Sequence, residues 1–177
     1  MRTISLISAL TAALAGTVVL TASAALAESG QETISVSGSG VDLASDAIVH
    51  SEQSTPTGMV RRLTEIVELD GDVNGKVLYQ ATQEFDFVAN KLVVTGENYF
   101  SGTIAGSEPV MLRSDESRFE VNLATGEEVG KVHLTRATDA PHKGSWYECD
   151  LVVVGTGLTP EGNPTFDYTG SCTRRGA

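Results

Sequence analysis

Apolar and polar residues alternate along much of the chain after residue 58. The clearest case is the segment 77–87, where Val77, Tyr79, Phe85 and Phe87 belong to one row of mainly apolar positions. The residues between them are mostly polar. A period of two residues is typical of a β-strand with one face in a core and the other in water.

Shorter segments of the same character recur at regular spacing and are separated by turns. The turns are rich in Gly, Asp and Asn, as in the sequence DGDVNG at 70–75. Short strands at this spacing predict a β-sandwich or a β-barrel, and the alternation favours antiparallel pairing. About eight strands are expected, at 59–69, 77–87, 92–95, 99–104, 118–123, 129–136, 147–154 and 166–172.

The region before these segments, residues 28–57, is polar and shows little periodicity. It predicts at most a short strand at 33–36 and a short helix within 42–50, in an otherwise irregular lead-in. We therefore divide the chain into a leader at 1–27, a polar lead-in at 28–57 and a β-barrel domain at 58–177.

The two cysteines, Cys149 and Cys172, lie in the last two predicted strands. Cys149 is in phase with the apolar Tyr147 and Leu151, and Cys172 is in phase with the apolar Tyr168. Directly opposed residues of an antiparallel pair point to the same face of a sheet. The pattern therefore predicts a C-terminal hairpin that carries a Cys149–Cys172 disulfide, since a metal or redox pair would favour C-x-x-C spacing or nearby histidines.

The first 27 residues have the pattern of a secretory signal peptide. Arg2 forms a minimal basic region, residues 4–20 carry no charge, and Ala25 and Ala27 stand at the −3 and −1 positions before Glu28. An uncleaved membrane anchor is the alternative, but Thr and Gly interrupt the apolar run. We expect cleavage after Ala27 and a secreted or periplasmic protein, and the absence of a Cys near that site argues against a lipoprotein.

Charge narrows the classes of partner. Without the leader the chain keeps 11 Lys and Arg against 23 Asp and Glu, a net charge of −12. Nucleic-acid affinity comes largely from Lys and Arg that neutralise phosphates, and an acidic surface also repels anionic membranes. We therefore expect no nucleic-acid partner and no membrane insertion after cleavage.

One turn resembles half of a calcium loop. Asp70, Asp72, Asn74 and Gly75 match the first positions of an EF-hand, but position 12, which should be a bidentate Glu, is Ala81. A polar hairpin turn uses the same residue types for local reasons. We predict no metal and keep Asp70, Asp72 and Asn74 as a weak calcium candidate.

Motifs for hydrolase or nucleotide chemistry are absent from the sequence. His50, His133 and His142 share no metal-site spacing, and the Gly155-Thr156-Gly157 loop is not followed by a predicted helix. No cofactor is predicted, and no residue can be assigned a catalytic role.

Several polar residues fall in the apolar rows. Gln83 lies in the row of Phe85, Arg61 and Glu65 are in phase with Leu63, and Arg113 and Asp115 share the parity of Phe119. Inward polar groups among aromatic side chains are what a ligand site in a small barrel requires. A β-bulge, which reverses the parity and turns such side chains to water, is the alternative. The predicted ligand-binding residues are Arg61, Glu65, Tyr79, Gln83, Phe85, Tyr99, Arg113 and Phe119.

Three stretches carry a family resemblance. These are GDVNGKVLYQ from Gly71, the segment NYFSGTIAGS from Asn98, and VVVGTGLTPEGNPTFDYTG from Val152. They resemble the secreted bacterial members of the allene oxide cyclase-like barrel family, which are related in fold to dirigent proteins. The resemblance implies an all-β, eight-stranded antiparallel β-barrel with a central apolar cavity, often assembled as dimers or trimers. It places no family catalytic residue on this chain.

Other β folds fit less well. A lipocalin usually has Gly-x-Trp near its first strand, whereas Trp146 lies late in this chain. An immunoglobulin-like sandwich places its Trp between the two cysteines, and Trp146 precedes both.

Three functional hypotheses remain open at this point. The barrel could bind a small apolar molecule, or it could act as a cyclase or isomerase that orients a reactive molecule. The third hypothesis is a non-catalytic structural or interaction protein whose interior is filled by side chains.

Overall fold

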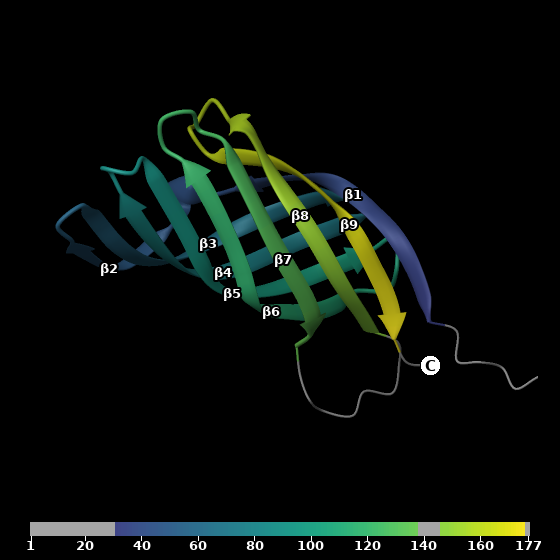
Figure 1. The fold of residues 1–177 in the computed structure, drawn as a ribbon. Coiled ribbons are helices and arrows are strands. Elements are labelled where there is room, and N and C mark those ends of the chain that lie inside the picture. The colour runs from purple at the N-terminus through teal and green to yellow at the C-terminus, as the bar shows by residue number, and fades with distance from the viewer. Residues whose placement is uncertain (1–30, 138–145, 176–177) are drawn as a thin grey trace, which may run out of the picture.

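The computed structural model describes residues 31–137 and 146–175, and these are almost entirely β-strand (Figure 1). A single short 3-10 helix, η1, lies within these residues at Ala44–Asp46. No helix in the described part of the chain is long and apolar enough to cross a membrane. The strands are β1 (Glu32–Asp42), β2 (Ile48–Ser54), β3 (Gly58–Gly71), β4 (Val73–Asp86), β5 (Lys91–Ile104), β6 (Val110–Asn122), β7 (Glu128–Arg136), β8 (Trp146–Leu158) and β9 (Pro164–Arg175).

The sheet closes on itself as a barrel. From β3 to β9 each strand pairs antiparallel with the next one along the chain, and β1 pairs with both β9 and β3. Eight strands thus form the closed barrel, and β2 is an extra strand on the first half of β3. The predicted eight-stranded antiparallel barrel is confirmed.

The structure differs from the predicted lead-in mainly at β1: the short strand expected at 33–36 is part of an integral barrel strand, whereas η1 lies within the short helix expected at 42–50. The inward positions of β1 include Gly38 and Gly40, and a Cβ atom at either would overlap an aromatic ring of β9, Tyr168 or Phe166 respectively. Glycine leaves room for those rings, so the core side of β1 is filled by side chains of another strand. This is why the segment shows no apolar row in the sequence.

Tyr168 ties β9 to the turn between β3 and β4. Its ring is 1% exposed. Its hydroxyl accepts a hydrogen bond from the Val73 N–H (2.8 Å) and lies within donating distance of the carbonyls of Val73 (2.9 Å) and Asp70 (3.1 Å). These bonds satisfy buried backbone groups where the chain reverses direction.

The C-terminal hairpin forms as the parity of its residues predicts. Cys149 of β8 and Cys172 of β9 are directly opposed in the register, are fully buried and form a disulfide. The bond closes a loop of 23 residues and joins two strands that already pair. Constraining a loop of this size stabilises a fold by about 3 kcal/mol in the chain-entropy model.

Candidate functional site

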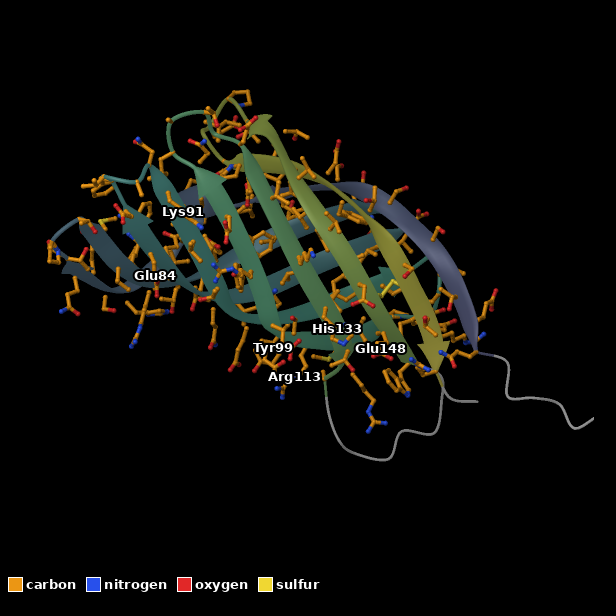
Figure 2. All side chains as sticks on the ribbon, in the orientation of Figure 1. Glu84, Lys91, Tyr99, Arg113, His133 and Glu148 are labelled. Atoms are coloured by element: carbon orange, nitrogen blue, oxygen red, sulfur yellow. A yellow bond between two sulfur atoms is a disulfide. The ribbon has the colours of Figure 1, made fainter. Side chains whose placement is uncertain are left out.

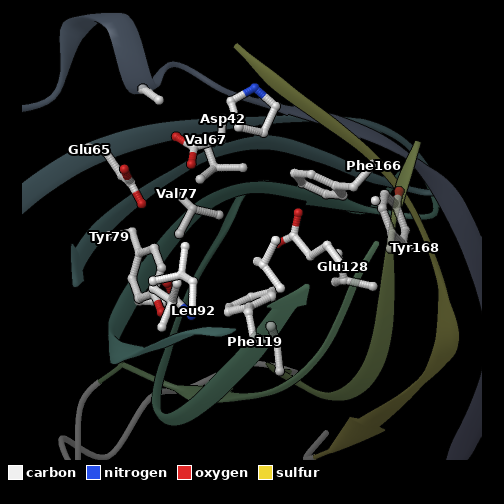
Figure 3. Close-up of a pocket in the computed structure, with 18 of the residues that line it drawn as sticks. Asp42, Glu65, Val67, Val77, Tyr79, Leu92, Phe119, Glu128, Phe166 and Tyr168 are labelled. Carbon is white, nitrogen blue, oxygen red and sulfur yellow. The ribbon is translucent and has the colours of Figure 1, made fainter. Parts of the chain in front are cut away.

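The barrel encloses a cavity of about 540 Å³ (Figure 3). This volume is within the range of sites that hold drug-sized molecules. Most of the wall is apolar. The apolar wall includes Val67, Leu69, Val77, Leu92, Val94, Phe119, Val121, Val132, Leu134, Leu151, Val153 and Phe166.

Strand alternation explains which side chains reach the cavity. On β8, Leu151 and Val153 line it and are 5% exposed, whereas their neighbours Val152 and Val154 are 41% and 48% exposed on the outer face. The inner face of each strand therefore supplies the wall, as the period of two requires.

Three carboxyl groups project into this apolar space. They belong to Asp42 at the end of β1, Glu65 in β3 and Glu128 at the start of β7 (Figure 3). Asp42 Oδ1 and Glu65 Oε2 are buried and have no hydrogen-bond partner. Glycine at position 155 leaves room for the Glu128 side chain, because a Cβ there would lie 2.8 Å from Glu128 Cβ.

Burial changes the acidity of this cluster. Burial and the nearby Glu128 carboxylate raise the pKa of Asp42 from 3.8 to about 7. Burial, and then the charges of Asp42 and Glu128, raise the pKa of Glu65 from 4.5 to about 8. Burial also raises the pKa of Glu128. Asp42 and Glu65 interact directly, so near neutral pH the pair holds a proton that an ordinary carboxyl would have lost.

Tyr79 adds a neutral hydroxyl to the same wall. It is 4% exposed, and its Oη lies 3.4 Å from the hydroxyl of Ser117. Burial raises the pKa of Tyr79 well above its usual value. Its ring packs against Phe119 with the centroids 6.0 Å apart. Tyr79 can therefore donate or accept a hydrogen bond while presenting an aromatic face.

Four of the residues predicted to bind a ligand line the cavity: Glu65, Tyr79, Gln83 and Phe119. Two others, Arg61 and Phe85, do not. The Arg61 guanidinium forms an ion pair with Glu52 of β2 (2.9 Å) and lies over the Phe85 ring, 5.6 Å from its centroid. These two residues contribute to the contact between β3, β4 and the extra strand.

The prediction that Arg113 and Tyr99 line the interior is wrong. Arg113 pairs with Asp115 (2.8 Å), and the Tyr99 hydroxyl donates to Glu97 (2.9 Å), both on the outside of the barrel (Figure 2). Tyr99 belongs to the outward row of β5, in which the inward positions are even-numbered.

A β-bulge in β6 explains the position of Arg113. Gly96 of β5 pairs with Ser117 and Asn98 pairs with Ser114, so β6 contains one extra residue at this point. The bulge reverses the parity, and Leu112 and Ser114 are buried in place of their neighbours.

The calcium candidate acts as a polar turn. Asn74 donates from Nδ2 to Asp70 Oδ1 (3.0 Å), and Asp72 Oδ2 accepts from the Ser37 N–H (2.9 Å). These bonds use the side chains to close the turn and to attach it to β1. Within residues 31–137 and 146–175, no cluster of three or more His, Cys, Asp or Glu is arranged to hold a metal ion.

Sequence reasoning missed Asp42 and Glu128. Asp42 shares the parity of Val36, Gly38 and Gly40, and Glu128 shares the parity of Gly130. If the glycines of β1 and β7 are counted as inward residues that make room for aromatic rings, the alternation along each strand places both carboxyls inside the barrel.

Comparison of the chain with known proteins finds no matching family model and no matching curated protein.

Proposed function

We propose that this protein binds a small, largely apolar molecule in the interior of its barrel. The observation that carries the proposal is the cavity of about 540 Å³, with an apolar wall interrupted by a few polar groups. Sites of this kind gain affinity from apolar burial and orientation from the polar groups. The open interior argues against the filled-barrel alternative.

Catalysis on the bound molecule is a second candidate. The Asp42–Glu65 pair and the Tyr79 hydroxyl all line one largely apolar cavity. A carboxyl that stays protonated near neutral pH can act as a general acid, and a tight cavity can orient a reactive molecule for cyclisation or isomerisation. The eight-stranded barrel and the resemblance to allene oxide cyclase-like proteins support this candidate.

A cavity-filling substitution tests the binding proposal. 1-Naphthalenemethanol, a neutral apolar probe, should bind the wild-type protein, and Val153→Trp should abolish binding because the indole occupies the space of the ligand. Val152→Trp is the matched control, since residue 152 is the outward neighbour and is 41% exposed. Isothermal titration calorimetry measures the affinity of the wild-type protein and of both variants for the probe.

Unchanged affinity in a folded Val153→Trp protein would contradict the proposal. If that variant does not fold, Val94→Phe fills the cavity from β5, where Val94 is 8% exposed, and should weaken binding in the same way.

We also infer that the protein is exported. The leader pattern of residues 1–27 supports export, although these residues lie outside the part that the structure describes. The Cys149–Cys172 disulfide supports it independently, because disulfides persist mainly in oxidising compartments.

The intact mass of the protein from its own host tests export. A chain that begins at Glu28 and is 2 Da lighter than the reduced form is expected, since each disulfide removes two hydrogen atoms. A full-length, reduced chain would contradict export.

A further inference from the structure

We propose that the ligand is an apolar amine, whose ammonium group is held by the carboxyl groups of Asp42, Glu65 and Glu128. This inference rests on the proposed function and names the chemical class of molecule that the same cavity takes. It follows from the charge of the wall, from unsatisfied acceptors and from the aromatic faces beside them.

The charge of the cavity has one sign. Three acidic side chains from β1, β3 and β7 meet there, and none of the described residues that line the cavity is Lys, Arg or His. On the outer surface, by contrast, carboxylates such as Glu52, Glu68 and Glu120 are paired with Arg or Lys. The cation that would complement the interior carboxyls is therefore missing from the wall itself.

Buried acceptors without partners point to the same conclusion. Glu65 is 3% exposed, and its Oε2 atom has no hydrogen-bond partner; Asp42 Oδ1 is also buried and unpaired. Leaving such groups unsatisfied is unfavourable, and proteins seldom do so without a reason. An ammonium group brings three donors and no acceptor, so it can serve both oxygens at once when it replaces the proton that the pair holds near neutral pH.

Aromatic rings flank the carboxyl cluster. Tyr79 and Phe119 lie in tilted contact, 6.0 Å between centroids, and Phe166 stands on the other side of the cavity (Figure 3). A cation is attracted to the face of such rings, and the Val and Leu side chains of the wall suit an apolar body. An anion would meet three carboxyl groups, and a neutral alcohol has one donor for two unpaired oxygens.

Three probes of similar shape test the inference at pH 7: 1-naphthylmethylamine, 1-naphthalenemethanol and 1-naphthoic acid. By calorimetry the amine should bind at least about tenfold more tightly than the alcohol, because charge-assisted hydrogen bonds replace a neutral one. The acid should bind most weakly. Equal or weaker binding of the amine relative to the alcohol would overturn the inference and leave the proposed function standing. If neither amine nor alcohol binds, the proposed function itself fails.

Substitutions in the carboxyl cluster test whether the preference for the amine arises there. Glu65→Gln should reduce the preference for the amine over the alcohol to about twofold or less, while the alcohol binds within about threefold of wild type. Glu84→Gln is the control, because Glu84 is exposed on the outer face of β4 (Figure 2). If Glu65→Gln does not fold, Glu128→Gln serves in its place.

Binding of the amine in the cavity must be distinguished from the general attraction of a cation to an acidic protein. A preference for the amine that Glu84→Gln reduces as much as Glu65→Gln does would overturn the inference. So would a preference that persists in Val153→Trp, since the cavity is filled in that variant.

Discussion

The free energy of unfolding should fall by several kcal/mol between pH 5 and pH 8, and Glu65→Gln should remove more than half of that fall. Burial and the charge of Glu128 raise the folded-state pKa of Asp42 to about 7, and burial with the charges of Asp42 and Glu128 raises that of Glu65 to about 8. In the unfolded chain these carboxyls lose their protons near pH 4.

The sign follows from the protons that each state holds. Between about pH 4 and pH 8 the folded protein keeps protons that the unfolded chain has released, so raising the pH favours unfolding. Each retained proton contributes about 1.4 kcal/mol per pH unit, and the loss of stability ends once the pH passes the folded pKa values. Two groups face the pair from other strands: the charge of Glu128 from β7 disfavours the ionisation of both carboxyls, and Tyr79 from β4 stays neutral because burial and the nearby carboxylates raise its pKa.

Urea denaturation at unit pH steps measures this dependence. Glu65→Gln keeps the shape of the side chain and removes the titrating group with the higher pKa of the two. Glu84→Gln, on the outer face, should leave the slope close to that of wild type. A wild-type stability that is flat or rises from pH 5 to pH 8, or a Glu65→Gln slope as steep as wild type, would contradict the assigned environment.

Gly38→Val should destabilise the protein by about 3 kcal/mol or more. A Cβ at this position would overlap the carbonyl oxygen of Asp70 and the hydroxyl of Tyr168. The Tyr168 ring is fully buried and its hydroxyl bonds to Val73, so the ring cannot move aside without breaking those bonds.

The neighbouring residue supplies the control. Ser39 is exposed on the outer face of β1, and Ser39→Val should change stability by no more than about 0.5 kcal/mol. Urea denaturation at constant pH compares the two variants. A Gly38→Val protein as stable as wild type would show that Tyr168 does not fill the inner face of β1 as described. Should Gly38→Val not fold, Gly38→Ala introduces the same Cβ with less bulk.

Most of the strands from β3 to β9 were predictable from their inward apolar side chains, but the structure joins the expected strands 92–95 and 99–104 into one, β5, and begins β6 at Val110 and not at residue 118. The Cys149–Cys172 pairing was also predictable, since parity alone aligned the two residues. β1 was not predictable in this way, because its inner face is completed by Tyr168 and Phe166 from the far end of the chain. The periodicity of a segment cannot reveal an aromatic ring that another strand supplies.

The error at Arg113 has a different cause. In β6 both parities contain an apolar residue, Met111 on one and Leu112 on the other, so the pattern is compatible with either register. The bulge between Ser114 and Ser117 decides between them, and it arises from pairing with β5 and β7. Because of this one extra residue in β6, the side chain of Arg113 lies on the outer surface and not in the predicted site.

The alternation along the strands predicts only part of the carboxyl cluster. Glu65 was found because it is in phase with Leu63 on a recognisable strand. Asp42 and Glu128 join it only because the barrel closes through β1 and brings β7 to the opposite wall. The closure of the barrel and the register of its strands therefore decide which inward polar residues meet. The apolar pattern of the single strands does not determine either.

Methyl NMR during a titration with 1-naphthalenemethanol tests the central claim, that the barrel interior is a ligand site, most directly. Resonances of the inward Val77, Val94 and Val153 should shift and saturate together, because these side chains line the cavity. Those of the outward Val129, Val152 and Val154 should stay in place, since they are 53%, 41% and 48% exposed on the opposite face. Shifts confined to the outward valines, or an interior set that does not respond at saturating probe, would contradict the claim.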